Sequence, residues 1–287
     1  MFLTCLTWNI EGLTRNLLDL KHHVDRQDPD LIFLQEPMCF QHDMTKINDV
    51  LGDNYKAILN SDDKYDNELP LQNNRAHGGY LTLYKKHLEP FITEIDSSSS
   101  RILPILLKMP GFAPSFHFNI YMPTAGKDAE YVEVLSNLKN LIEDCDSPGN
   151  IIFVRGDANA SIQVRKNNPR DKLFNHFVED MLLINHETNH NTYHHFTGDG
   201  LSDSSIDVLL ESSLSSTESV KEILCSKAES NIDSHHDIIV SMLSISIPSS
   251  NEDILAKPTE APRIENNRTK IIWSEEGIVQ FVQLTEH

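Results

Sequence analysis

The feature that most constrains the fold is a series of short apolar or alternating runs that recur along the chain. Runs of this kind, bounded by turn residues and rich in β-branched and aromatic side chains, are typical of β-strands. We expect strands at 2–9, 31–36, 78–86, 101–109, 115–123, 150–159, 204–211, 219–225 and 236–245.

Three segments between the strands have the periodicity of amphipathic helices. The clearest covers 128–145, where the apolar residues fall on one stripe, and the others cover 13–26 and 171–181. Many strands with a few interspersed helices favour an α/β sandwich, in which two sheets pack face to face and the helices lie outside.

The chain changes character after Ile247, where the sequence becomes polar and proline-bearing and loses all periodicity. A length of 287 residues suits one large domain plus a tail. We predict a domain over 1–247 and a polar linker or tail over 248–287, with a short amphipathic helix at 274–284.

Several classes of protein are disfavoured by simple sequence features. No run approaches the roughly 18 consecutive apolar residues of a membrane span, and the N-terminus lacks the basic and apolar regions of a signal peptide. The four cysteines are far apart and form no CxxC pair. We therefore expect an intracellular protein that is not secreted, with reduced thiols and without a structural zinc site.

The formal net charge of −19 bears on possible partners. An acidic excess opposes non-specific binding to nucleic acid, because phosphate contacts require lysine and arginine. A phosphodiesterase that uses a metal nevertheless needs carboxylates in its cleft and keeps only a local basic rim. The best candidate for such a rim is 164–172, although a loop of this composition is more often simply solvated.

Polar side chains stand where several of the expected strands end. A single carboxylate after a strand is more often a cap than a ligand, but here polar residues recur at strand ends and inside strand patterns across the whole domain. They are Asn9, Gln35, Glu36, Tyr121, Asp157, Asn159, Asp207, His235 and His236.

Hydrolysis of a phosphate ester would use all of these residue types. Glu36 with Asn9 offers the oxygen ligands that a hard divalent cation prefers. Asp157 beside Asn159 suits the orientation and deprotonation of water. The charge that gathers on the phosphate needs donors such as histidine, tyrosine or asparagine, and Asp207 would hold a histidine in that role.

The ordered series TWNIEGL, LIFLQE, FHFNIYMP, FVRGDANAS, SDSSIDVLL and SHHDIIVSM resembles the endonuclease/exonuclease/phosphatase superfamily, which includes deoxyribonuclease I. The resemblance covers roughly residues 1–247. It implies a four-layer α/β sandwich of two packed mixed sheets flanked by helices, and Mg²⁺-dependent hydrolysis of phosphate esters. Mn²⁺ is an alternative cation.

The resemblance also implies a role for each matching residue. By this resemblance Asn9 and Glu36 match the metal pair, and Tyr121 matches the phosphate-binding tyrosine. Asp157 and Asn159 match the two residues of the GDxN motif. Asp207 matches the aspartate that orients the histidine, and His236 matches the catalytic histidine.

The sequence departs from the family pattern at three places. His235 stands where the family usually has an aspartate that helps position the site and, in some members, contributes to metal binding. Asp237 cannot replace that aspartate, since it faces the opposite side of the strand. A neutral His235 is a candidate metal ligand but softer than Mg²⁺ prefers. We expect weakened activity or a shifted metal preference. Glu11 and Thr124 stand where asparagine is common.

Some features bear on the subgroup. Ser204 replaces the tryptophan that apurinic endonucleases carry, and 191–210 is most similar to the endonuclease domains of non-LTR retrotransposons. The tail 271–284 resembles the linker into a reverse transcriptase. These likenesses imply a DNA-nicking endonuclease that is part of a longer reverse transcriptase polyprotein. We expect it to be a monomer without a membrane partner, and to be nuclear when it acts on DNA.

Two other functions remain open from the sequence. A small-molecule or phospholipid phosphohydrolase of the same superfamily fits the acidic charge better than a DNA enzyme does. A catalytically impaired relic fits the histidine at position 235. For the alternating histidines of 192–196, an exposed strand face is favoured over metal binding.

Overall fold

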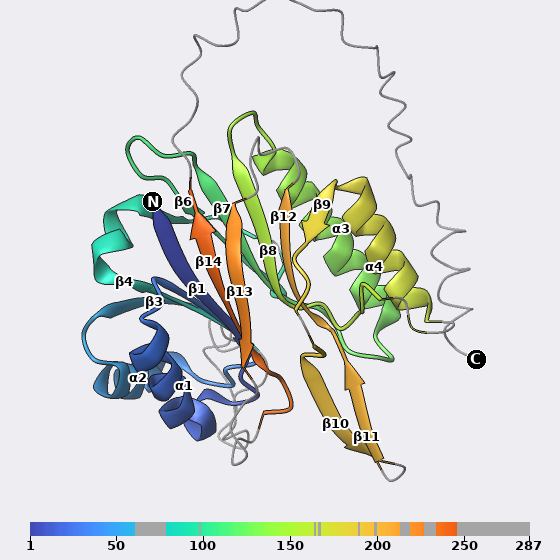
Figure 1. Cartoon of the computed structure of the whole chain (residues 1–287), viewed down its shortest axis with the longest axis horizontal. Coiled ribbons are helices and arrows are strands. Elements are labelled where there is room, and N and C mark those ends of the chain that lie inside the picture. Colours follow the sequence, from blue (N-terminus) through green and yellow to red (C-terminus); the bar gives the residue numbers. More distant parts are fainter. Residues whose placement is uncertain are drawn as a thin grey trace, which may run out of the picture.

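The structure is a computed structural model, and it describes residues 1–60, 79–97, 99–163, 165, 168–188, 190–197, 200–212, 219–226 and 234–245. The predicted tail 248–287 and its helix at 274–284 lie outside these residues. Figure 1 shows two sheets side by side with helices on both outer faces.

The first sheet has six strands in the order β13-β14-β1-β2-β4-β3. Strands β1 and β2 are parallel, and the other pairs are antiparallel. The strands in chain order are β1 (Phe2–Asn9), β2 (Leu31–Gln35), β3 (Tyr55–Asn60), β4 (Tyr80–Lys85), β13 (Val220–Ser226) and β14 (Ile238–Ser244).

The second sheet also has six strands, in the order β5-β6-β7-β8-β12-β9, with β7 and β8 parallel. Its strands in chain order are β5 (Ile92–Glu94), β6 (Ile102–Leu107), β7 (Ser115–Tyr121), β8 (Ile151–Asp157), β9 (Leu183–Asn185) and β12 (Asp207–Ser212). A separate hairpin of β10 (Tyr193–Thr197) and β11 (Gly200–Ser204) extends from one end of the sandwich (Figure 1).

Helices cover the outer faces of both sheets (Figure 1). Helices α1 (Leu13–Gln27) and α2 (Met44–Leu51) lie on the first sheet, and α3 (Asp128–Cys145) and α4 (Pro169–Asp180) lie on the second. Two 3₁₀ helices, η1 (Gln41–Asp43) and η3 (Lys86–Phe91), complete the described elements. Helix α4 begins where the Asn168 side chain accepts hydrogen bonds from two backbone N–H groups of its first turn.

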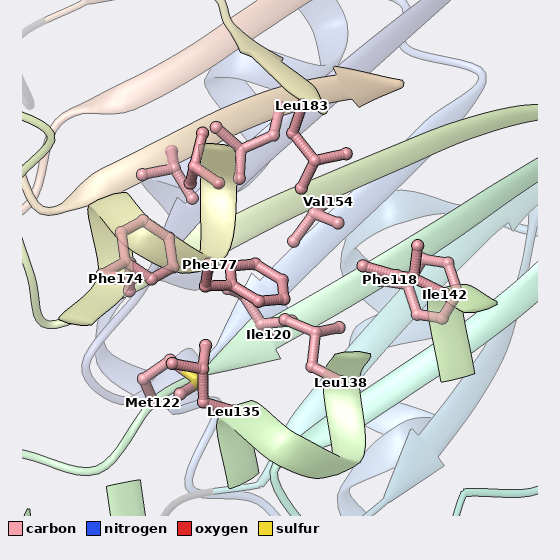
Figure 2. Packing of buried hydrophobic residues seen from close by; sticks show 14 of the residues in the cluster. Phe118, Ile120, Met122, Leu135, Leu138, Ile142, Val154, Phe174, Phe177 and Leu183 are labelled. Atoms are coloured by element: carbon pink, nitrogen blue, oxygen red, sulfur yellow. The ribbon is translucent and has the colours of Figure 1, made fainter. Parts of the chain in front are cut away.

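The apolar side chains divide among three cores because successive residues of a strand face opposite sides. In β2, Leu31 and Phe33 join the core between the sheets, whereas Ile32 and Leu34 pack under α1 and α2. Figure 2 shows the third core, in which Phe174 and Leu138 of the helices meet the second sheet. Three cores require four layers, so the predicted four-layer α/β sandwich is confirmed.

Every strand that the sequence predicted overlaps a strand of the structure, and the three predicted helices correspond to α1, α3 and α4. The prediction missed α2, the edge strands β3, β5 and β9, and strand β11, while 192–196, considered as an exposed strand face, corresponds to β10. Two of these edge strands, β5 and β9, have only three residues, which is too few for a period-2 pattern to stand out.

A candidate active site at one end of the two sheets

The sheet topology brings the predicted residues to one end of the sandwich. Asn9 ends β1, and Glu36 directly follows its parallel neighbour β2. Tyr121 ends β7 and lies in register with Asp157, which ends the parallel strand β8. Asp207 begins β12 and lies in antiparallel register with Asp157.

Asn9 connects the two sheets at this end. Its Nδ2 donates to Oε1 of Glu36 and to Oδ2 of Asp157, both at 3.0 Å. Asn9 is fully buried and Asp157 is 2 % exposed, so their hydrogen bond is shielded from water, whereas the bond to Glu36 is partly buried. The amide therefore sets the separation of the two carboxylates.

The backbone around these residues adopts unusual conformations. Glu36 and Asn159 have φ angles of 49° and 48°, in the left-handed region that non-glycine residues rarely occupy. Gly156 has φ 127°, and a Cβ atom there would lie 2.1 Å from the carbonyl oxygen of Ile120. Only glycine fits this approach of β8 to β7, and conformations of this cost are concentrated at functional sites.

His236 and Asp207 form a buried pair. Nδ1 of His236 lies 2.9 and 3.0 Å from the two carboxylate oxygens of Asp207. The carbonyl of His236 accepts from Trp8 Nε1 at 3.0 Å, which fixes its backbone. Nε2 points toward Asp157, 3.9 Å from Oδ2. Asp207 therefore holds the ring and leaves Nε2 directed at the site.

The pKa values of His236 and Asp157 both shift upward. Burial alone would lower the pKa of His236, but the charges of Asp207 and Asp157 outweigh it and raise the pKa to about 9. Burial raises the pKa of Asp157 well above its ordinary range, although His236 opposes this. His236 is thus suited to carry a proton at neutral pH, and Asp157 is suited to accept one.

Asn159 and Tyr121 flank this group. Asn159 donates its backbone N–H to Oδ1 of Asp157 at 2.8 Å, and its Nδ2 donates to the carbonyl of Met122. Tyr121 is buried, and burial followed by the nearby charge and hydrogen bond of Glu36 raises the pKa of its phenol. The phenol therefore keeps its proton and remains a hydrogen-bond donor.

The donor set fits a hard divalent cation. Glu36 and Asp157 supply carboxylate oxygens on either side of the Asn9 Nδ2, and the amide oxygen of Asn9 accepts from the Glu11 N–H at 3.3 Å. Asp157, Asp207 and His236 also offer ligand atoms within 4.8 Å of one another.

His235 has a different partner. Its backbone N–H and its Nδ1 both lie near Oε2 of Glu11, at 2.7 and 2.9 Å. Its side chain is 45 % exposed, and no contact joins it to Glu36 or Asn9 among the described residues. Glu11 and His235 therefore contact each other, which sequence reasoning missed because it treated them as separate departures. Asp237 points away from the site, toward His194.

A cleft of about 650 Å³ opens over these residues. Two arginines that line the cleft belong to the predicted basic rim, 164–172, but both are already paired: Arg165 with Asp171 at 2.7 Å, and Arg170 with Asp128. Tyr193 of β10 also lines the cleft, with its ring centroid 4.8 Å from that of His236. Sequence reasoning considered 192–196 as an exposed strand face but did not single out Tyr193, because only the fold brings β10 beside His236.

Solved structures with the same fold include nucleases and a phosphatase. The AP endonuclease LMAP from Leishmania major shares 14 % identity over 85 % of this chain and 88 % of that chain, with a TM-score of 0.64. The endonuclease domain of TRAS1, a telomere-specific non-LTR retrotransposon, shares 12 % over 84 % and 98 %, with a TM-score of 0.61. The 3′ phosphatase NExo from Neisseria, bound to a product DNA hairpin, shares 13 % over 84 % and 99 %, with a TM-score of 0.59.

Among curated proteins no sequence match was found. None of the described helices has the length and apolar character needed to cross a membrane.

Comparison with models of protein families agrees with the structural comparison. The model of the Endonuclease/Exonuclease/phosphatase family matches residues 6–227. That is well over half of the chain, and the chain therefore belongs to the endonuclease/exonuclease/phosphatase family.

Proposed function

We propose that this chain is a phosphodiesterase that depends on a divalent cation, Mg²⁺ or Mn²⁺, and nicks DNA. One observation carries the proposal. Asn9 joins Glu36 to Asp157, and Asp157 faces Nε2 of His236, so that an oxygen-rich cation site adjoins a histidine held by a carboxylate.

In this proposal Glu36 and Asn9 hold the cation, with Asp157 beside them. When bound, the cation would neutralise charge on the phosphate and polarise its oxygen. The carbonyl of Asn9 accepts from Ser234 Oγ at 2.7 Å, which fixes the backbone of the ligand. His235 remains at the rim and is not needed as a ligand.

The protein groups around the cation site have separate tasks. Asp157 accepts a proton from the attacking water, and the backbone N–H of Asn159 orients its carboxylate. His236 donates from Nε2 to a phosphate oxygen while Asp207 stabilises its charge, and the Tyr121 hydroxyl is a second donor. Burial of these groups strengthens each of these interactions.

Several observations support DNA and a retroelement origin. The TRAS1 endonuclease domain is covered to 98 % of its length, and Ser204 lines the cleft where the sequence pattern of apurinic endonucleases has tryptophan. In this view the chain is a monomeric domain that acts in the nucleus as part of a longer reverse transcriptase polyprotein, and DNA is its partner.

A small-molecule or phospholipid phosphohydrolase is the second candidate. The net charge of −19 supports it, as do the ion pairs that occupy Arg165 and Arg170, the two arginines among the described residues that line the cleft. Such a substrate carries one or two phosphates and needs fewer cationic contacts than a DNA strand does.

The experiment that decides is incubation of the protein with supercoiled plasmid and Mg²⁺ or Mn²⁺, beside a phosphoinositide panel. We expect relaxed circles, and their loss in Glu36→Ala and His236→Ala. Phosphate release from the panel without relaxed circles would favour the second candidate. Equal inertness of wild type and Glu36→Ala with both cations would identify an impaired relic.

A further inference from the structure

A second group of metal-ligating side chains lies outside the cleft, where the β10–β11 hairpin meets β13 and β14. His190 precedes β10, His194 lies in β10, Cys225 lies near the end of β13, and Asp237 precedes β14. The backbone holds these segments together, since Asp237 N–H donates to the Thr192 carbonyl at 2.7 Å. Figure 1 shows the hairpin extending from the end of the sandwich below these strands.

One carboxylate oxygen is the centre of this group. Oδ2 of Asp237 lies 3.1 Å from His194 Nε2, 3.8 Å from His190 Nε2 and 3.9 Å from Cys225 Sγ. The ligand atoms of His190, Cys225 and Asp237 all lie within 4.8 Å of one another. Asp237 is 3 % exposed, so its negative charge is buried among two imidazoles and a thiol.

These separations are near the edges of a tetrahedral zinc site but do not equal them. With bonds of about 2.0 Å to oxygen and nitrogen and 2.3 Å to sulfur, ligand atoms around zinc lie about 3.3 to 3.6 Å apart. The three distances to Asp237 fall on both sides of this range. Binding of the ion would therefore require side-chain rotations that draw His190, Cys225 and His194 around Asp237.

A further carboxylate orients His194. Oδ1 of Asp203 lies 2.9 Å from Nδ1 of His194, and Oδ2 of Asp237 lies 3.1 Å from its Nε2, so both ring nitrogens face carboxylates. Zinc binding would displace the proton of Nε2, while Asp203 would keep that of Nδ1. A carboxylate behind a histidine is the usual arrangement at zinc ligands, where it fixes the tautomer and raises the basicity of the ring.

We propose that His190, Cys225, Asp237 and His194 bind a zinc ion, which fastens the β10–β11 hairpin to the edge of the first sheet. Two imidazoles, a thiolate and a carboxylate select a borderline-soft ion over Mg²⁺. The sequence predicted no structural zinc site because it looked for paired cysteines, whereas this site draws its ligands from three separate segments.

The site has a consequence for the cleft. Asp237 follows His236 directly, and Tyr193, next to His194, contacts the His236 ring. A zinc ion bound to Asp237 and His194 would therefore restrain the positions of the cleft residues His236 and Tyr193, which are adjacent to them in the sequence. Burial, followed by the charge of Asp237, raises the pKa of the Cys225 thiol to about 12. Zinc binding would therefore release a proton from this thiol at neutral pH.

The test is a titration of the full-length, tag-free apoprotein with Co²⁺ and then Zn²⁺. It uses the Glu36→Ala variant, in which the active-site cation site is weakened. We expect one equivalent of Co²⁺ to give a thiolate-to-cobalt charge-transfer band and the intense visible bands of a tetrahedral site, both removed by Zn²⁺.

Cys225→Ser should lose the charge-transfer band, whereas Cys145→Ser, which removes another buried thiol, should keep it. His190 is 40 % exposed, so His190→Ala leaves the core intact and should weaken zinc binding more than tenfold. Asp203→Asn should weaken it about 10- to 100-fold. Circular dichroism would verify that each variant folds.

Absence of the charge-transfer band in the folded protein, or its persistence in Cys225→Ser, would overturn the proposal. The result does not depend on the hydrolytic function, because the readout is spectroscopic. A protein that binds zinc in this way but cleaves no phosphodiester would contradict only the proposed function.

Discussion

The floor and the rim of the cleft differ in burial and in chemistry. The floor residues are at most 8 % exposed, and the family pattern predicts each of them. They are Asn9, Asp157, Asp207 and His236. The outer edge of the cleft carries the departures from that pattern, at Glu11, Thr124, Ser204 and His235. We call these four residues the rim, as distinct from the basic segment 164–172. The side chain of His235 is 45 % exposed and that of Glu11 is 22 % exposed.

The contact between Glu11 and His235 explains how the rim departs without disturbing the floor. The family pattern has a carboxylate at position 235 and often an amide at position 11. Here a carboxylate at 11 accepts from a histidine at 235. A carboxylate thus remains at the rim but on the opposite segment, and we expect the two substitutions to compensate each other. The floor supplies the chemistry, and the rim adjusts it.

The largest loss of nicking activity is expected from substitutions at the floor of the cleft. His236→Ala removes the donor to the phosphate and should lower the nicking rate about 10³-fold at any Mg²⁺ concentration. Glu36→Ala removes a cation ligand, so that excess Mg²⁺ should restore part of its activity. The measurement is plasmid nicking across a Mg²⁺ titration. Equal losses without rescue would mean that the two residues do not have separate roles.

The next effect concerns the charge on His236. Asp207→Asn removes the main influence that raises the pKa of His236, so that this pKa should fall. Wild-type activity should rise with pH as Asp157 loses its proton and fall above about pH 9 as His236 loses its own.

In Asp207→Asn the alkaline limb should move to lower pH, and kcat/KM should drop roughly 10- to 100-fold. The acid limb serves as the internal control, since it reports Asp157. An unchanged alkaline limb in this variant would show that Asp207 does not set the charge of His236.

The sequence allowed the floor to be predicted, because its residues end strands whose apolar pattern is visible over short windows. Parallel neighbours then bring Asn9 next to Glu36, and Tyr121 next to Asp157, at one edge. The contact of Glu11 with His235 joins residues 224 positions apart. No local pattern carries that information, since it depends on the pairing of β1 with β14.

Arg155 shows the same limit. In the structure it is fully buried, and its guanidinium lies 4.7 Å from the centroid of the Phe33 ring. Stacking of this kind depends on how the two sheets pack together. The proximity of His190, Cys225 and Asp237 could not be predicted for a similar reason, because only the tertiary fold brings their segments together.

A smaller effect is expected at the rim. His235→Asp alone would place two carboxylates at hydrogen-bond distance, and their repulsion would offset any benefit of restoring the family residue. Glu11→Asn with His235→Asp restores both positions, and it should raise the nicking rate about tenfold over wild type, or about 1.4 kcal/mol. Rates of both single variants and the double variant measure the coupling.

His235→Ala serves as the control for simple loss of the histidine. If His235→Asp alone matched or exceeded the double variant, the two substitutions would not compensate each other, and the rim would have lost a carboxylate that it needs.

The smallest expected effect is on the salt dependence of DNA binding. Arg165 and Arg170 line the cleft but are paired with Asp171 and Asp128. DNA binding should therefore release few counterions, with a slope of log K against log salt of about −1 to −2. Arg165→Ala should change this slope by less than about 1, and Lys172→Ala, an exposed residue of the same segment, is the matched control. A slope near −5 would require free cations beyond the exposed Lys172 of the described part of 164–172, and it would place DNA on another face. A shallow slope would mean that the rim selects its substrate by shape and by individual contacts, while the binding energy comes from the cation and the floor.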